Sequence, residues 1–220
     1  MKLHLGCGER YLEGYRNIDF PPSHHSVQKK TVADEQTNIL TLQYPGETIE
    51  EVRLHHVFEH FPRPTALALI AGWYSWLRPG GRIHLEVPDV KRQMQVLLDP
   101  SSSLHDRLLS VRHVFGSHEA DWAYHYEGYT PENLQFLLEA YGFEIIRLEK
   151  NNWMGTHNFE IVGQKTKAGM SRHDFEATTR QVLAQYLLDN SSTEQTLLGV
   201  WMTEYRNQVE KTWHRQGAQV

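Results

Sequence analysis

The 220-residue chain is short of several residue types, and each shortage excludes a class of protein. Its one cysteine, Cys7, rules out an internal disulfide and suits a reducing compartment. No block of five or more Lys or Arg occurs and the formal net charge is −5, which argues against nucleic acid as a partner. No apolar run approaches the roughly 18 residues that a membrane helix needs. The opening MKLHLGCGE also lacks the apolar segment of a signal peptide.

What the chain does contain is typical of a folded protein. Hydrophobic residues make up 40% and aromatic residues 11% of the sequence, which predicts a packed core rather than disorder. The length suffices for one sizeable domain, or for one domain with an appendage. The composition therefore predicts a soluble, cytoplasmic protein without a membrane or nucleic-acid partner.

Strand and helix patterns alternate through the first three quarters of the chain. Predicted strands cover residues 2–5, 17–20, 51–58, 82–87, 143–149 and 159–164. Predicted helices cover residues 64–78, 90–98, 104–115 and 131–141. This alternation favours an α/β, doubly wound, Rossmann-like sheet that is mostly parallel, with an antiparallel last strand.

A C-terminal extension follows a change of composition near residues 165–169. We predict a domain over 1–165 and a helical hairpin over 166–220, with helices at 172–189 and 193–214.

The predicted caps of these two helices are Ser171 and Ser192, the latter in a capping box with Gln195. The second helix carries an apolar stripe that includes Leu198, Trp201 and Val209 in its sequence. That stripe must be covered, either as a lid over the active site or in a two-fold homodimer interface. The sequence leaves both alternatives open.

The first strand runs directly into Gly6-Cys7-Gly8, a turn that lets a ligand approach the backbone closely. A dinucleotide fingerprint needs a third glycine where this chain has Tyr11, so an NAD site is disfavoured. Asp19 ends the second strand, where a carboxylate can accept hydrogen bonds from two ribose hydroxyls. A tight turn and a turn cap are the structural alternatives for these two features.

Residues 56–60, HVFEH, match the H-x-x-E-H pattern that indicates a zinc peptidase when it lies on a helix. The neighbouring residues argue against a helix, because a strand pattern over 52–58 precedes the motif and Pro62 and Pro64 follow it. No third ligand is evident in the sequence. We therefore predict a strand end and no metal, with the zinc peptidase kept as an alternative that stoichiometric zinc would support.

Five segments in order, LHLGCG, NIDF, NILTLQYP, VRLHHVFEHF and LRPGGRIHLEVPD, resemble class I S-adenosylmethionine-dependent methyltransferases. The resemblance covers about residues 1–165 and is closest to the type-11-like group that acts on small molecules and glycans. It implies S-adenosyl-L-methionine as cofactor and SN2 transfer of its methyl group to an O or N atom of a small-molecule or sugar-like acceptor. The cofactor-binding residues that it implies are Gly6, Cys7 and Gly8 (methionine portion), Asp19 (ribose), Asn38 and Ile39 (adenine), and His56 (amino-acid end).

The acceptor side is predicted to come from an insertion at 90–130, whose end is rich in aromatic and polar residues that suit a ring-bearing or sugar acceptor. The resemblance implies His125 as a general base, and Glu59 and His60 as residues that orient or deprotonate an acceptor hydroxyl. These last two residues could instead cap the turn. A metal on His118, Glu119, Asp121 and His125 would have a spacing that fits no standard zinc site.

A non-catalytic binding or scaffold protein on a methyltransferase fold is the second hypothesis. Only about ten residues separate Gly8 from Asp19, too few for a full crossover helix between the first two strands. Cofactor binding without turnover would favour this alternative.

Overall fold

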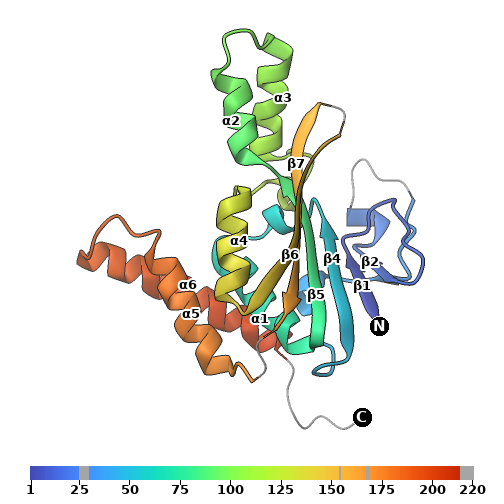
Figure 1. Cartoon of the computed structure of the whole chain (residues 1–220), viewed down its shortest axis with the longest axis vertical. Coiled ribbons are helices and arrows are strands. Elements are labelled where there is room, and N and C mark those ends of the chain that lie inside the picture. Colours follow the sequence, from blue (N-terminus) through green and yellow to red (C-terminus); the bar gives the residue numbers. More distant parts are fainter. Residues whose placement is uncertain (25–29, 154, 167–168, 214–220) are drawn as a thin grey trace.

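A seven-stranded sheet forms the centre of the protein (Figure 1) in the computed structural model, which describes residues 1–24, 30–153, 155–166 and 169–213. Its strand order is β3-β2-β1-β4-β5-β7-β6. The strands are β1 (Lys2–Leu5), β2 (Arg16–Asp19), β3 (Glu35–Gln36), β4 (Ile49–His55), β5 (Leu77–Pro88), β6 (Phe143–Trp153) and β7 (Thr156–Lys165). Strands β1 to β5 pair in parallel and β7 is antiparallel to both β5 and β6, which confirms the predicted doubly wound sheet.

Six α-helices accompany the sheet over the described ranges. They are α1 (Arg63–Trp76), α2 (Val90–Leu98), α3 (Leu104–Phe115), α4 (Pro131–Ala140), α5 (Arg172–Ala184) and α6 (Ser192–Thr212). Helices α2 and α3 have the predicted bounds and project from one end of the molecule, beside the tip of the β6–β7 hairpin (Figure 1). Thr130 caps α4 in a capping box with Asn133. None of these helices has both the length and the apolar character needed to cross a membrane.

The connection between β1 and β2 contains no helix, as the short spacing predicts. Its start is anchored to β2, because the N–H groups of Gly6 and Cys7 both donate to Ile18 O, at 2.8 and 3.1 Å. The first strand end is therefore a tight turn held by backbone hydrogen bonds, rather than a turn that opens a helix.

The fourth strand is shorter than predicted. It ends at His55, and the predicted continuation over 56–58 is wrong because His56 has a positive φ of 52°, which no strand residue adopts. Residues Phe58–His60 then form a single 3₁₀ turn, η3, before α1 begins.

The apolar stripe of the second C-terminal helix is covered within the chain, and the predicted homodimer stays a prediction. Leu198, Met202, Tyr205 and Val209 of α6 are buried within the same chain. Helix α6 packs along α1, and its last turn accepts a hydrogen bond of 2.8 Å from Trp76 Nε1 to Thr212 O. The stripe is therefore neither a lid over the cavity nor an exposed dimer surface, and the apolar face that motivated a homodimer is already covered.

Two helix ends also differ from the sequence prediction. The N-cap of α6 is Ser191, whose side chain accepts from Glu194 N, so the predicted box of Ser192 and Gln195 is displaced by one residue. Helix α5 ends at Ala184 rather than 189, because the next N–H groups bond three residues back, as Gln185 N does to Val182 O and Tyr186 N to Leu183 O. Ser171 caps α5 as predicted, and residue 214, the predicted end of α6, lies outside the described residues.

A buried ammonium group ties β7 to the end of α1. Lys165 Nζ donates to Tyr74 O at 3.0 Å and to Leu77 O at 2.7 Å, so a cation satisfies carbonyls at the C-terminus of the helix. We expect Lys165→Met to lower the free energy of unfolding by about 2 kcal/mol, because two charge-assisted hydrogen bonds are lost and the added apolar contact offsets only part of that loss.

Urea denaturation measures this loss, with Lys150→Met as the matched control on the exposed side of β6. The control is expected to stay within about 0.5 kcal/mol of the wild type. Equal stabilities for the two variants would contradict the role given to Lys165.

Candidate functional site

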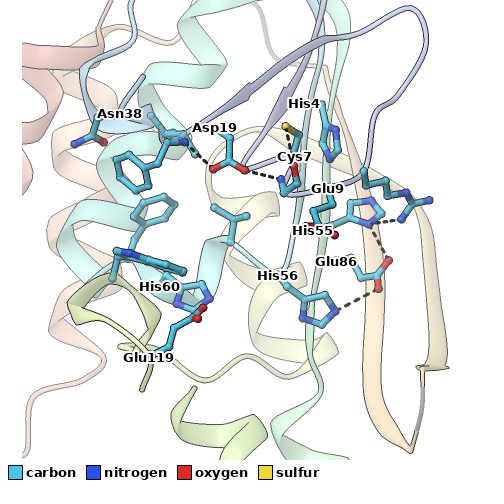
Figure 2. Close-up of a pocket in the computed structure, with 18 of the residues that line it drawn as sticks. His4, Cys7, Glu9, Asp19, Asn38, His55, His56, His60, Glu86 and Glu119 are labelled. Atoms are coloured by element: carbon cyan, nitrogen blue, oxygen red, sulfur yellow. Dashed lines mark hydrogen bonds and ion pairs between the residues drawn. The ribbon is translucent and has the colours of Figure 1, made fainter. Parts of the chain in front are cut away.

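A cavity of about 1100 Å³ opens at the carboxyl ends of β1, β2, β4 and β5 (Figure 2). This edge is where doubly wound sheets bind their ligands, and the volume suits a ligand the size of a nucleoside. All of the cofactor-binding residues that the sequence indicated line this one cavity: Gly6, Cys7, Gly8, Asp19, Asn38, Ile39 and His56.

Asp19 is held rigidly at the end of β2. Its Oδ2 accepts from Gly8 N at 2.6 Å and its Oδ1 accepts from Phe20 N at 2.7 Å, and the residue is only 6% exposed. The carboxylate thus joins the glycine turn to β2 and is fixed before any ligand arrives. The N–H groups of residues 6–8 already donate hydrogen bonds within the chain. A ligand would therefore contact this turn through its carbonyl groups and through van der Waals contact with its backbone.

Asn38 and Ile39 shape another part of the wall. Asn38 Oδ1 accepts from Leu40 N at 2.9 Å and so caps a 3₁₀ turn, η2, over Ile39–Thr41. Ile39 is buried within the described structure and lines the cavity with an apolar side chain. A fixed apolar wall of this kind suits the face of a purine ring.

Glu86, at the end of β5, links two histidines that differ in charge. His55 Nε2 accepts from Arg53 Nε at 2.7 Å, and its Nδ1 lies 3.1 Å from Arg10 Nη1 and 3.3 Å from Glu86 Oε2. Burial, and after it the charge of Arg53, lower the pKa of His55 to about 3. This ring is therefore neutral at physiological pH.

His56 is the cationic member of the pair. It lies 3.5 Å from Glu86 Oε1 through Nε2 and 3.4 Å from Glu59 Oε1 through Nδ1. Burial alone lowers the pKa of His56, but the two carboxylates outweigh it and raise the pKa to about 10. The cavity floor thus holds an imidazolium between two carboxylates.

The zinc-peptidase alternative finds no support in this geometry. His56 lies in a left-handed turn and His60 in a separate 3₁₀ turn, so the two residues do not share a face of a continuous helix. Both ring nitrogens of His56 are directed to carboxylates instead.

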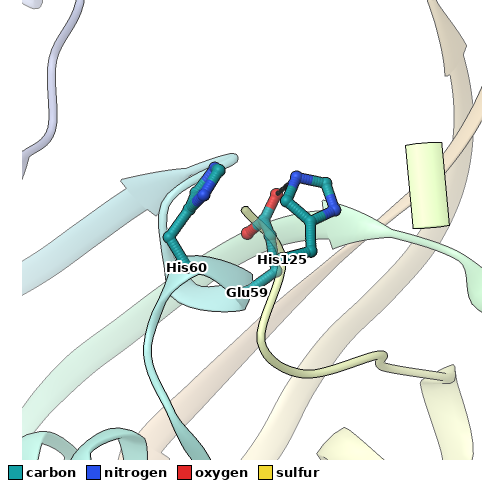
Figure 3. Close-up of side chains that lie close together, drawn as sticks. All are labelled: Glu59, His60 and His125. Carbon is teal, nitrogen blue, oxygen red and sulfur yellow. Dashed lines mark ion pairs between the residues drawn. The ribbon is translucent and has the colours of Figure 1, made fainter. Parts of the chain in front are cut away.

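Glu59, His60 and His125, the three predicted catalytic residues, lie together (Figure 3). Glu59 and His60 come from η3, and His125 comes from the segment that follows α3 and η4 (Asp121–Ala123). That segment is held against η3 because Tyr126 N donates to Glu59 O at 2.9 Å. One ligand atom from each of the three side chains lies within 4.8 Å of the others.

The two imidazoles of this cluster have the same tautomer. His60 Nδ1 lies 3.1 Å from Tyr124 O, and His125 Nδ1 lies 2.9 Å from His113 O. Since a carbonyl only accepts, each Nδ1 carries the proton and each Nε2 of the neutral ring keeps its lone pair. The pKa of His125 is lowered, mainly by burial, and this keeps the ring neutral. Both rings can therefore accept a proton or bind a cation through Nε2.

The rest of the insertion is only partly assembled at the site. Over the described residues, His118, Glu119 and Asp121 do not join His125 in a cluster with ligand spacing, so the four-residue metal site is not formed. Among the aromatic residues at the end of the insertion, Trp122 and Tyr126 line the cavity, Tyr124 is exposed, and Tyr129 is buried against Phe58.

The sequence interpretation missed two contributions to the cavity. Glu86 could have been found, because it lies at the carboxyl end of a predicted strand, where ligands bind. The other contribution is the hairpin tip at Asn151, Asn152 and Trp153, which β6 carries to the cavity by extending beyond its predicted end. No local pattern indicates that contact, because it depends on how far the hairpin reaches.

The ionisable residues lining the cavity are mainly acidic. Arg10 is its one arginine or lysine, and five carboxylates line it: Glu9, Asp19, Glu86, Glu119 and Asp121. Even with His56 as a cation, the described wall is negatively charged. A low-dielectric concavity of this sign attracts a cationic ligand.

The reactivity of Cys7 tests how tightly the cavity wall is packed around this thiol. The residue is 3% exposed, and burial, with Asp19 as the next cause, raises the pKa of its thiol to about 12. Because the thiolate is the reactive form, we expect a thiol reagent at pH 8 to label the native chain roughly a thousandfold more slowly than an exposed cysteine.

The labelling is followed by mass spectrometry in buffer and in urea, where the single thiol should react completely within minutes. Rapid stoichiometric labelling of the native protein would contradict this account of Cys7.

The comparisons with known proteins identify the family and the fold. A family model described as a methyltransferase domain matches residues 5–148. No curated protein matches the chain. A crystal structure of a SAM-dependent methyltransferase from Methanosarcina mazei is similar at 18% identity, with a TM-score of 0.51, over 76% of this chain and 92% of that one.

A second similar structure is the 1,6-didemethyltoxoflavin-N1-methyltransferase of Burkholderia thailandensis, solved with 1,6-didemethyltoxoflavin and S-adenosylhomocysteine. It has 16% identity and a TM-score of 0.50, over 76% of this chain and 71% of that one. At such identities these two structures support the fold, while the family model spans well over half of the sequence. The chain therefore belongs to the methyltransferase-domain family, with the fold of class I S-adenosylmethionine-dependent methyltransferases.

Proposed function

We propose that this protein is an S-adenosylmethionine-dependent methyltransferase that methylates an oxygen or nitrogen of a small-molecule or sugar-like acceptor. One observation carries the proposal: the predicted cofactor residues, which come from separate strand ends, line a single cavity in a chain of this family.

The residues of the cavity fit the cofactor part by part. The fixed carboxylate of Asp19 suits two ribose hydroxyls, and Ile39 offers an apolar wall to adenine. The glycine turn and His56 lie where the methionine portion would be held. Both N–H groups of His56 face Glu59 and Glu86, so its imidazolium would act on the methionine carboxylate through its charge alone. The acidic wall suits a sulfonium cation.

S-adenosylmethionine would supply a methyl group whose leaving group, the thioether S-adenosylhomocysteine, departs readily. The protein's task is then to align the acceptor and exclude water. Trp122, Tyr126 and Trp153 give the cavity an aromatic rim that suits a ring or sugar, and His60 places a polar group beside it. The acceptor side would thus be built by the insertion and the β6–β7 hairpin together.

The test is incubation of the purified protein with isotopically labelled S-adenosylmethionine and cell extract, followed by mass spectrometry of the small-molecule fraction. We expect at least one labelled product that is absent with a catalytically impaired Asp19→Ala variant. If the protein bound S-adenosylhomocysteine but labelled nothing across extracts and acceptor panels, the catalytic proposal would fail. The second candidate, a binding or scaffold protein, would then hold, as the helix-free link between β1 and β2 suggests.

A further inference from the structure

The cluster of Glu59, His60 and His125 has a donor set that the methyl-transfer proposal does not fully use. One carboxylate and two imidazoles converge from two segments some 65 positions apart in the chain, with ligand atoms within 4.8 Å of one another. In Figure 3 the carboxyl group of Glu59 lies between the two rings. Ligands on one ion at about 2.1 Å lie up to roughly 4 Å apart, so a small closure of the side chains would enclose an ion.

Glu59 provides the second, independent observation. It is 1% exposed, and neither of its carboxylate oxygens accepts a hydrogen bond from any described group. Its nearest charge is the His56 imidazolium, whose Nδ1 lies 3.4 Å from Oε1, and the neutral His125 ring has its Nε2 4.0 Å from the same oxygen. A buried carboxylate that lacks hydrogen bonds is costly, and a bound cation is one of the few groups that compensate for it.

The hydrogen bonds around the imidazoles are those of metal ligands. His60 and His125 each donate Nδ1–H to a backbone carbonyl, of Tyr124 and His113 respectively, which orients the ring and leaves Nε2 free to ligate. His56, the cation beside Glu59, is also paired with Glu86, so it keeps a carboxylate partner when an ion occupies the cluster.

We propose that Glu59, His60 and His125 bind one divalent transition-metal ion at the wall of the cavity. Two imidazoles and one carboxylate favour ions such as Zn²⁺, Mn²⁺, Fe²⁺ or Co²⁺ over Mg²⁺ and Ca²⁺. Three protein ligands leave coordination positions open. His60, one of the three, lines the cavity, so an open position on its side would face the ligand space.

The open positions also indicate an acceptor class, in a step that rests on the proposed methyl-transfer function. A hydroxyl oxygen bound to the ion would lose its proton more readily, so it would attack the methyl carbon as an alkoxide. The O–CH₃ bond forms as the S–CH₃ bond breaks, and the hydroxyl proton passes to solvent. His125 then acts as a ligand rather than as the general base, because ligation uses the Nε2 lone pair.

The experiment titrates chelator-stripped full-length protein with Co²⁺ alone, by calorimetry and by visible absorption. We expect one site with the ligand-field bands of a low-symmetry Co²⁺ complex, and at least tenfold weaker binding in both His60→Gln and His125→Gln. His118→Gln is the matched control, because this nearby imidazole bonds Phe115 O outside the cluster. Thermal unfolding without metal checks that each variant is folded.

Two outcomes would overturn the proposal: no stoichiometric Co²⁺ binding, or binding that the two cluster variants leave unchanged. The same stripped protein is also titrated with S-adenosylhomocysteine. Binding of that ligand without Co²⁺ binding would remove the metal site and leave the methyltransferase proposal standing, whereas the reverse pattern would remove the methyltransferase proposal alone.

Discussion

Replacing Asp19 with alanine should weaken S-adenosylhomocysteine binding by about 100-fold. The side chain is fixed by two backbone N–H groups, at 2.6 and 2.7 Å, so it meets a ribose without reorganisation. Hydrogen bonds to a charged acceptor contribute roughly 1.5–3 kcal/mol each, and loss of two ribose contacts accounts for about 3 kcal/mol. Calorimetry on the folded variant measures the change.

The matched control for this result is Glu9→Gln. Glu9 also lines the cavity but is exposed, so its removal tests the general attraction of the acidic wall without touching the ribose position. We expect a weakening of less than threefold, consistent with a solvent-screened charge. Similar losses in the two variants would mean that net charge, rather than the geometry of Asp19, governs binding.

Gly6→Ala is expected to be the most destabilising small substitution at the cavity. Gly6 has a φ of +69°, and a Cβ there would lie 2.3 Å from Val57 Cγ2. The left-handed backbone costs about 1 kcal/mol for alanine, and overpacking adds roughly 1–3 kcal/mol, so we expect a loss of about 3 kcal/mol in unfolding free energy.

Gly14→Ala separates these two causes. Gly14 has a φ of +80° but no atom within 4 Å of its would-be Cβ, so this variant should lose only about 1 kcal/mol. The double variant Gly6→Ala, Val57→Ala should recover part of the Gly6→Ala loss, because the clashing methyl group is gone. Urea denaturation of all four proteins provides the test, and equal losses for the two single glycine variants would refute the steric explanation.

Features set by local sequence were predictable. Helices α2 and α3 matched their predicted bounds because Asp89 and Ser103 cap their starts and Gly116 ends the second. Where two adjacent residues compete for a cap, as Ser191 and Ser192 do, the sequence cannot choose, since either hydroxyl can accept from the N–H three residues further on. In the structure Ser191 is the cap, and Asp189 Oδ1 accepts from its N–H.

Features set by distant contacts were beyond the sequence. The apolar stripe of α6 predicted burial, but nothing local identified α1 as its partner. His56 lines the cavity, yet its left-handed turn depends on tertiary contacts that include Glu86. Glu59, His60 and His125 were each assigned to the acceptor side, while their mutual contact required the insertion to fold back onto η3.

The central claim is that this cavity binds the methyl-donor cofactor, and calorimetric titration of the wild-type protein with S-adenosylhomocysteine tests it most directly. We expect a single saturable site per chain with a dissociation constant in the range of about 1–100 μM, or roughly −8 to −5.5 kcal/mol. Absence of saturable heat at millimolar ligand would contradict the claim.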